Sequence, residues 1–280
     1  MKVAVVGCGS IGTRHLKILK AHGVETYAVD VDPWVRDYAH FSLDAISSET
    51  LADVPSVDAW MICTPAHLHF EATTHALNAG GAVFVEKPFT MSLGEARTLT
   101  RMAAKHQRQT MVACNMRFHR EVAAVALRDY TNPSGWAHWH YSGNMGVWPG
   151  VAYAPALWEC IHEVDLALAT FGEATVAEAR ITDDKATLTL VHGEDTSLIQ
   201  IDGRALVPSR GVTVGNGYGI TTHFNWDMGI DAVDQMYRDE VEHFLDCVRN
   251  KATPPATFAD GLVAVEVVNE AYRLARRAHA

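Results

Sequence analysis

The chain has 280 residues, of which 48% are hydrophobic and 20% are charged, and its formal net charge is −10 at pH 7. This length allows one large domain or two packed domains, and the composition is ordinary for a globular protein. The chain is acidic and has no basic run, which argues against nucleic-acid binding. It has no apolar run of about 18 residues, which argues against a membrane span. Its five cysteines are widely spaced and form no Cys-x-x-Cys pair, which argues against a disulfide framework or a structural zinc site.

The first 115 residues alternate short β-branched runs with longer amphipathic stretches, which is typical of βαβ units around a doubly wound parallel sheet. The predicted strands cover residues 2–6, 25–29, 59–63, 82–85 and 110–113. The predicted helices cover residues 10–21, 69–78 and 92–106. The last of these helices opens with Ser92-Leu93-Gly94-Glu95, the spacing of a capping box. The chain begins without the pattern of a secretory signal, so a cytoplasmic location is expected.

After Arg117 the pattern changes to that of an α+β domain with an open, mainly antiparallel sheet. We expect strands at 136–141 and in several alternating segments between 176 and 224, a loop over 142–155, and helices at 121–129, 157–171, 235–250 and 260–278. The predicted domains are therefore a Rossmann domain over residues 1–118 and an α+β domain over residues 119–280. The final helix could pack back on the first domain.

The sequence GCGSIG places three glycines between a predicted strand and a predicted helix, as the dinucleotide-binding fingerprint requires. Gly7 permits a tight turn, Gly9 lets the backbone approach a pyrophosphate, and Gly12 allows the helix to pack closely on the strand. The pyrophosphate would bind the N–H groups of the helix start, around Ser10 and Ile11.

An acidic residue ends the second predicted strand, 18 residues after the third glycine: Asp30. Its carboxylate can accept hydrogen bonds from the adenosine ribose and would repel a 2′-phosphate, so NAD is favoured over NADP. Asp32 competes for this role, but Pro33 follows it, and we expect Asp32 to cap the next turn.

Five motifs in order resemble the glucose-fructose oxidoreductase, inositol dehydrogenase and MocA group of NAD(P)-dependent oxidoreductases (Gfo/Idh/MocA). They are GCGSIG (7–12), ICTPAHLHFE (62–71), VEKPF (85–89), CNMRFH (114–119) and IHEVD (161–165). The resemblance implies a Rossmann domain, a second domain with an open sheet, and a homodimer or homotetramer formed through that sheet.

The resemblance also implies that Lys87 lies beside the nicotinamide and hydrogen-bonds the substrate hydroxyl whose carbon exchanges the hydride. Its place at the end of a strand fits, because ligands of open α/β sheets bind at the carboxyl ends of strands. Glu86 would hold the cofactor or orient the loop, and Pro88 would fix the backbone, with a cis Lys87–Pro88 bond as a hypothesis. In isolation, Lys87 would be read as an exposed lysine in a surface turn.

Further cofactor contacts implied by the resemblance come from Thr64, Pro65, His69 and Asn115. Arg117 has two interpretations that the residues alone leave open. Its guanidinium could bridge cofactor and substrate, or it could form a salt bridge at the domain interface.

The resemblance makes His162 the partner of Lys87 in moving the proton of the alcohol, a role that suits an imidazole near neutral pH. On a helix, Glu159, His162 and Glu163 would share one face. Many family dehydrogenases carry an Asp four residues before this histidine, where this chain has Trp158. Whether Glu159 replaces that carboxylate stays open. Tyr153, in the preceding loop, is predicted to line the substrate pocket.

Three pairs have the spacing of metal ligands: His67-x-His69, His138-x-His140 and Glu159-x-x-His162. None makes a complete site alone, and hydride transfer to a nicotinamide needs no metal, so we expect none.

The predicted function is hydride transfer between NAD and a secondary alcohol or ketone carbon of a sugar, cyclitol or sugar derivative. Lys87, His162 and Glu159 would be catalytic, and Arg117 and Tyr153 would help bind the substrate. Two alternatives stand beside it: a non-catalytic NAD-binding sensor or assembly protein, and an imine or amino-acid reductase on the same scaffold.

Overall fold

The structure is a computed structural model that describes residues 1–122, 135–144, 156–216, 219, 221–226 and 228–278. The chain divides into two compact units. Unit 1 comprises Met1–Cys114 and Tyr237–Leu262, and unit 2 comprises Asn115–Met236 and Val263–Ala280. Each unit contains one six-stranded sheet. Among the described residues, no helix is long and apolar enough to cross a membrane.

The sheet of unit 1 is parallel throughout and has the strand order β3-β2-β1-β4-β5-β6. Its strands are β1 (Lys2–Val6), β2 (Glu25–Val29), β3 (Ile46–Ser48), β4 (Ala59–Ile62), β5 (Ala82–Val85) and β6 (Thr110–Val112). The strand order reverses between β1 and β4, and in sheets of this kind ligands bind beside such a reversal at the carboxyl ends of the strands.

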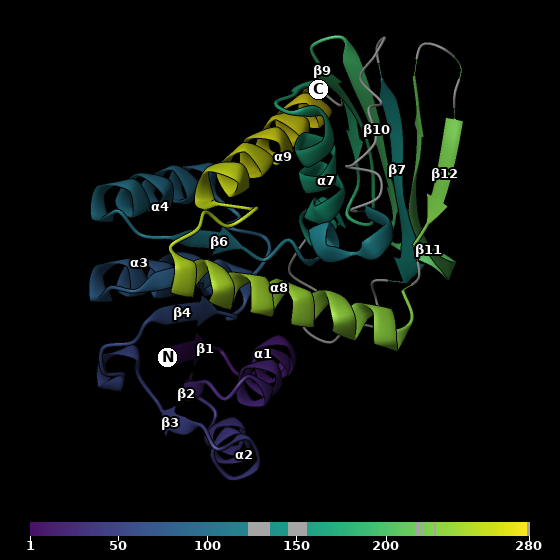
Figure 1. The fold of residues 1–280 in the computed structure, drawn as a ribbon. Helices are drawn as coiled ribbons and strands as arrows, with labels where there is room; N and C mark the ends of the chain where they lie inside the picture. The colour runs from purple at the N-terminus through teal and green to yellow at the C-terminus, as the bar shows by residue number, and fades with distance from the viewer. Residues whose placement is uncertain (123–134, 145–155, 217–218, 220, 227, 279–280) are drawn as a thin grey trace. The chain divides into compact units, whose positions relative to one another are not determined.

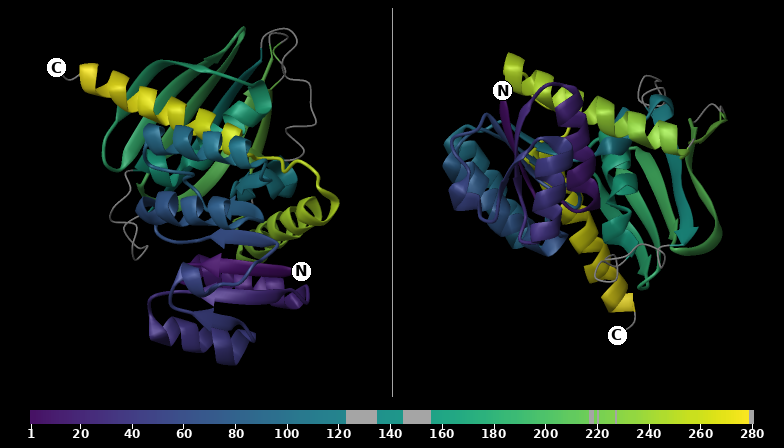
Figure 2. Two further views of the ribbon diagram at one scale, coloured as in Figure 1. Left: turned by 90° about the vertical axis from the view of Figure 1, so that its left-hand side faces the viewer. Right: turned by 90° about the horizontal axis from the view of Figure 1, so that it is seen from below.

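Helices cover both faces of this sheet, so the doubly wound prediction is confirmed (Figures 1 and 2). The helices α1 (Ser10–Ala21) and α2 (Pro33–Leu43) lie on one face, and α3 (His69–Ala79) and α4 (Leu93–His106) lie on the other. Because the sheet is covered on both sides, every residue of β4 and β5 is buried, which explains their continuous apolar runs. Two 3₁₀ turns, η1 (Leu51–Asp53) and η2 (Ala66–Leu68), join these elements.

The strands and helices predicted within residues 1–114 agree with the structure to within one residue at each end, but helix α2, strand β3 and the two 3₁₀ turns were not predicted. The Asp32 side chain accepts a hydrogen bond from the backbone N–H of Trp34 at 2.9 Å, so Asp32 caps α2 as expected. The capping box before α4 is wrong: Ser92 is the N-cap residue, but its side chain makes no cap hydrogen bond.

The sheet of unit 2 has the order β12-β11-β7-β10-β9-β8. Its strands are β7 (Trp136–Asn144), β8 (Thr175–Ile181), β9 (Lys185–His192), β10 (Asp195–Asp202), β11 (Arg204–Gly215) and β12 (Thr221–Asn225). Only β7 and β10 pair in parallel among these strands, so the mainly antiparallel prediction is confirmed. Alternate residues of β9 and β10 face the core, as Ala186, Leu188 and Leu190 do in β9.

The helix expected over residues 157–171 is two helices, α6 (Ala156–Glu159) and α7 (Ile161–Phe171). Cys160 separates them with φ −99° and ψ 34°, which interrupts the helical path. A 3₁₀ turn, η3 (Asn115–Phe118), opens unit 2, and α7 packs against β7 and β10 (Figure 1). Most of the helix expected over 121–129, and Tyr153, lie outside the described residues. The chain ends with α8 (Ile230–Asn250) and α9 (Phe258–Ala278).

Candidate active site

The turn between β1 and α1 contains three glycines. Two of them leave no room for a larger residue, and the third faces open space. Gly7 has φ +83°, and a Cβ there would lie 2.7 Å from the backbone nitrogen of Thr64. A Cβ on Gly12 would overlap the carbonyl oxygen of Gly7. By contrast, a Cβ on Gly9 would meet no atom within 4 Å. Gly7 and Gly12 are therefore required for close packing, whereas Gly9 borders open space.

Helix α1 begins at this turn in a form that suits an anion. Gly9 is its N-cap residue, and no side chain caps it and no acidic residue lies in its first turn. The first N–H groups of a helix need acceptors, and the helix dipole favours negative charge there. The described residues therefore fit the pyrophosphate of a dinucleotide, and its contact with Gly9, Ser10 and Ile11 stays a prediction.

Asp30, at the end of β2, is held by two backbone groups. Its Oδ2 accepts the N–H of Cys8 at 2.7 Å, and its Oδ1 accepts the N–H of Asp32 at 2.9 Å. These bonds fix a carboxylate beside the glycine turn. Burial, and secondarily the Asp30 charge, raise the pKa of the Cys8 thiol to about 12, so this thiol stays protonated at neutral pH.

The segment after β5 carries Lys87 and is held from both sides. The buried Glu86 carboxylate lies 2.9 Å from Nε2 of His15 through Oε1, and its Oε2 accepts the backbone N–H of Lys87 at 3.2 Å. The Lys87–Pro88 peptide bond is cis, which confirms that hypothesis. Of the two roles considered for Glu86, orienting the loop is the one that this geometry supports.

His69, at the start of α3, links two loops at this edge of the sheet. Its Nδ1 lies 2.9 Å from the Pro88 carbonyl oxygen, and its Nε2 lies 2.9 Å from that of Thr64. The side chain is buried, and burial lowers its pKa, although both carbonyls act in the opposite direction. A neutral imidazole can donate to only one of these two carbonyl oxygens.

In unit 2, Arg117 forms a bidentate ion pair with Asp165 of α7. Its Nε lies 2.8 Å from Oδ2 and its Nη2 lies 2.6 Å from Oδ1. Both side chains are largely buried, with relative exposures of 15% and 5%. The salt-bridge interpretation of Arg117 therefore holds, but with a partner inside its own unit. Contact of Arg117 with a substrate stays a prediction.

A second ion pair holds the other side of α7. Glu163 is fully buried, and its Oε1 lies 2.7 Å from Nε of Arg210 on β11. The Arg210 guanidinium lies 5.4 Å from the centre of the Tyr141 ring. Each helical residue turns by about 100°, so His162 lies on the arc between Glu163 and Asp165. The buried His162 is thus carried by a helix that is fixed on both flanks. No pattern among the neighbouring residues indicates a role for Arg210 or Tyr141.

Trp158 and Glu159 belong to α6 and are separated from His162 by the break at Cys160. Trp158 is buried and stacks on Tyr272 of α9, with ring centres 6.4 Å apart and planes at 18°. Trp158 therefore belongs to the packed interior of unit 2. The predicted common face of Glu159, His162 and Glu163 on one continuous helix is wrong, because the helix breaks and Glu163 faces Arg210.

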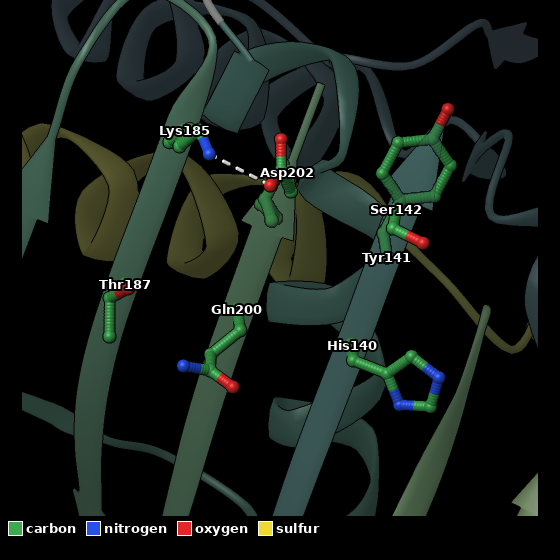
Figure 3. Close-up of a pocket in the computed structure, with 8 residues that line it drawn as sticks. His140, Tyr141, Ser142, Lys185, Thr187, Gln200 and Asp202 are labelled. Atoms are coloured by element: carbon green, nitrogen blue, oxygen red, sulfur yellow. Dashed lines mark hydrogen bonds and ion pairs between the residues drawn. The ribbon is translucent and has the colours of Figure 1, made fainter. Parts of the chain in front are cut away.

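A cavity of about 350 Å³ lies on the sheet of unit 2 (Figure 3). Its lining contains none of the predicted site residues, and an ion pair of 2.8 Å between Lys185 and Asp202 crosses part of it. The side chains of His140, Thr187 and Gln200 project from the strand face that alternates with the core face. Of the residues described above, the lining shares only Tyr141, whose ring also lies beside the Arg210 guanidinium. It is lined by His140, Tyr141, Ser142, Lys185, Thr187, Gln200, Ile201 and Asp202.

The histidine pairs with ligand-like spacing are used otherwise where the structure shows them. His69 contacts two carbonyl oxygens, and Nε2 of His140 lies 3.0 Å from Oγ of Ser209. Within the described ranges, no group of three or more His, Cys, Asp or Glu side chains could hold a metal ion.

Comparisons with known proteins agree with this geometry. Residues 1–114 match the model of the oxidoreductase family with an NAD-binding Rossmann fold that is designated Gfo/Idh/MocA. The chain is 25% identical to the scyllo-inositol 2-dehydrogenase (NAD(+)) of Bacillus subtilis, covering 95% of this chain and 92% of that protein. It is 24% identical to the D-apiose dehydrogenase of Paraburkholderia graminis, and the match covers 98% of this chain and 88% of that protein. The crystal structure of GenD2 from gentamicin A biosynthesis, in complex with NAD, has the same fold, with a TM-score of 0.88 and 18% sequence identity. The match covers 99% of this chain and 95% of GenD2.

Proposed function

Because the chain belongs, through residues 1–114, to the Gfo/Idh/MocA family of NAD-binding oxidoreductases, we propose that it is a dehydrogenase. The reaction is hydride transfer between NAD and a secondary alcohol or ketone carbon of a sugar, cyclitol or sugar derivative. The observation that carries the proposal is the Glu86–Lys87–Pro88 turn, held at the carboxyl end of β5 in the sheet that bears the glycine turn. The inositol and apiose dehydrogenases among the relatives support a polyol-like substrate.

The environment of Asp30 supports NAD over NADP. A 2′-phosphate would meet the fixed Asp30 carboxylate, and an arginine is the usual group that accommodates that phosphate. Arg36 lies close, but its Nη1 donates to the carbonyl oxygens of Asp30 and Val31 at 2.7 and 3.0 Å. Its Nη2 lies 3.4 Å from Glu49. Both ends of this guanidinium are therefore already engaged.

The bound nicotinamide would supply the carbon that accepts or returns the hydride. Lys87 hydrogen-bonds the reacting oxygen, His162 exchanges its proton, and Glu159 supports that exchange. Thr64, Pro65 and Asn115 contact the cofactor, and Arg117 and Tyr153 border the substrate. These roles are supported by the family motifs and, for Lys87, by a strand end of the kind where ligands of open α/β sheets bind.

The test is to mix the protein with NAD and a panel of sugars and cyclitols and to follow the absorbance of reduced nicotinamide. We expect turnover of at least one polyol, and its loss in Lys87→Ala and His162→Ala. Lys105→Ala is the matched control, because Lys105 is an exposed lysine in the last turn of α4, away from the predicted site residues of the sequence. Undiminished turnover in Lys87→Ala would remove this mechanism.

A second function is favoured by Trp158, which occupies the position of a family carboxylate and packs on Tyr272. In that case the chain is a non-catalytic NAD sensor or assembly protein. Binding of NAD without turnover across a broad panel would support it. An imine or amino-acid reductase is distinguished by adding imines and amino acids to the same panel.

We also propose a homodimer or homotetramer that forms through the sheet of unit 2. The strand face that bears the cavity also bears Trp136, which is 37% exposed, and rows of threonines that suit sheet packing. Sedimentation of the wild-type chain and of Thr187→Arg, which adds a charge to that face, tests this assembly. Equal sedimentation as monomers would reject it.

A further inference from the structure

The Glu86 carboxylate is a buried acceptor whose two oxygens have different partners. Glu86 is 8% exposed, one oxygen faces His15 and the other accepts the Lys87 backbone N–H. When the Glu86 carboxylate is ionised it only accepts hydrogen bonds, and Nε2 of His15 is then the donor of this contact. A buried carboxylate deprived of a donor is strongly disfavoured. His15 is therefore the side chain that keeps Glu86 in place.

His15 itself has no freedom to move. It lies on α1, is 0% exposed, and packs edge-on against the rings of Phe84 and Tyr237, with ring centres 5.4 and 5.8 Å away. The Arg14 guanidinium covers Tyr237 at 4.6 Å. The ring is thus clamped between the sheet and α8, with Nε2 directed at Glu86.

The same segment is held on its other side by His69. The Pro88 carbonyl oxygen lies 2.9 Å from Nδ1 of His69, which is also buried. The backbone on either side of the Lys87 side chain is therefore tied to an imidazole, from α1 through Glu86 and from α3 through Pro88. A lysine at an ordinary surface turn would not require two buried histidines.

We propose that His15 is a positioning residue for Lys87, acting through the Glu86 carboxylate. Resting on the proposed function, this assigns to α1 a second task beyond phosphate binding: the helix that would receive the pyrophosphate at its first turn also fixes the backbone of the catalytic lysine. His15 touches neither substrate nor cofactor in this role. It sets where the Lys87 ammonium lies, and so acts on the chemical step more than on dinucleotide affinity.

The first experiment separates kcat from binding in His15→Leu, which is close in size but donates no hydrogen bond. We expect kcat to fall by about 10- to 100-fold, because small misplacements of a catalytic group have effects of this order. The KM and the dissociation constant for NAD should change by less than about threefold, a difference of roughly 0.65 kcal/mol. His15→Gln restores a side-chain N–H and should recover most of kcat. His75→Leu is the control, because His75 packs edge-on against Trp60 within the same unit.

The second experiment reads the lysine itself and needs no turnover. The protein is acylated briefly with acetic anhydride, and modification of Lys87 is measured by mass spectrometry across pH. We expect the labelling rate of Lys87 to change by about threefold or more in His15→Leu, because the amine then lies in different surroundings. It should stay at the wild-type value in His15→Gln and His75→Leu.

Wild-type labelling of Lys87 and wild-type kcat in a folded His15→Leu protein would overturn the proposal. If His15→Leu does not fold, Glu86→Gln, which keeps the shape and removes the carboxylate, decides by the same two measurements. A wild-type chain that oxidises no polyol counts against the proposed function alone, because the labelling comparison still supports or overturns the role of His15.

Discussion

The guanidinium of Arg117 meets the carboxylate of Asp165 through two bonds, Nε to Oδ2 at 2.8 Å and Nη2 to Oδ1 at 2.6 Å. This pair ties the turn that opens unit 2 to the helix that carries His162. Asp165 is only 5% exposed, so removing its partner leaves a buried charge without compensation.

Arg117→Met should therefore lower the free energy of unfolding by about 3 kcal/mol. Urea denaturation followed by circular dichroism measures it. The control is Lys185→Met, which breaks an ion pair whose side chains are 54% and 42% exposed. That change should stay within about 1 kcal/mol. Equal effects of the two substitutions would show that burial of the Arg117 pair has no consequence for stability.

The second ion pair of α7 calls for a double-mutant cycle. Glu163 is fully buried opposite Arg210, and Oε2 of Glu163 and Nη2 of Arg210 have no hydrogen-bond partner among the described residues. Each single change, Glu163→Leu or Arg210→Met, should destabilise the protein by about 3 kcal/mol because it strands the other charge.

The double variant should be destabilised by much less than the sum of the two single changes. An incompletely hydrogen-bonded buried ion pair can be replaced by apolar residues with little loss of stability. Thermal or urea unfolding of all four proteins gives the coupling energy. Additive effects would mean that the two side chains do not depend on each other.

Gly9 and Gly12 should respond to alanine in opposite ways. A Cβ on Gly12 would overlap the Gly7 carbonyl, so Gly12→Ala should lower stability by about 2 kcal/mol or more. A Cβ on Gly9 meets nothing within 4 Å, so Gly9→Ala should change stability by less than about 1 kcal/mol. Yet it fills the space where a pyrophosphate approaches, so NAD should bind about tenfold more weakly. Calorimetry of unfolding and of NAD titration separates the two effects. Unchanged NAD affinity in Gly9→Ala would place the phosphates elsewhere.

The strands of unit 1 were predictable because helices on both faces make their sequences continuously apolar. Helix α2 was missed for the opposite reason. Only Ala39 and Leu43 of this helix are buried, whereas the larger apolar residues Trp34 and Phe41 are 80% and 78% exposed, so the apolar stripe that faces the core is short. The break at Cys160 left no signal, since neither glycine nor proline stands there.

In the candidate site, features set by neighbouring residues were predictable, and contacts between residues far apart in the sequence were not. The glycine turn and the cis bond before Pro88 follow from short motifs that specify their own backbone. The ion pairs of α7 join residues 48 and 47 positions apart, a distance over which a single sequence offers no pairing rule. The residues around His15 predict only a helix, because nothing in them shows that Glu86, 71 positions later, lies beside it.

The last prediction concerns pH and His69. Burial is the largest cause that lowers the pKa of His69 below its ordinary 6.5. The unfolded chain therefore binds a proton at this histidine more readily than the folded chain does. Where the unfolded state binds more protons, stability rises with pH. The contribution of His69 is thus complete above about 6.5 and is lost as the pH falls from there toward the lowered folded pKa.

Urea unfolding at pH 7.5 and at pH 5.5 should therefore show a loss of stability on acidification in the wild-type chain. Burial also lowers the pKa of His140 and His192, so these side chains contribute in the same direction. His69→Gln, which can still donate to one carbonyl oxygen, should lose part of this pH dependence, whereas His75→Gln should keep it. If His69→Gln loses as much stability between pH 7.5 and pH 5.5 as the wild-type chain does, the buried imidazole is not the group that responds to acid. The neutral form assigned to His69 between the carbonyl oxygens of Thr64 and Pro88 is then wrong.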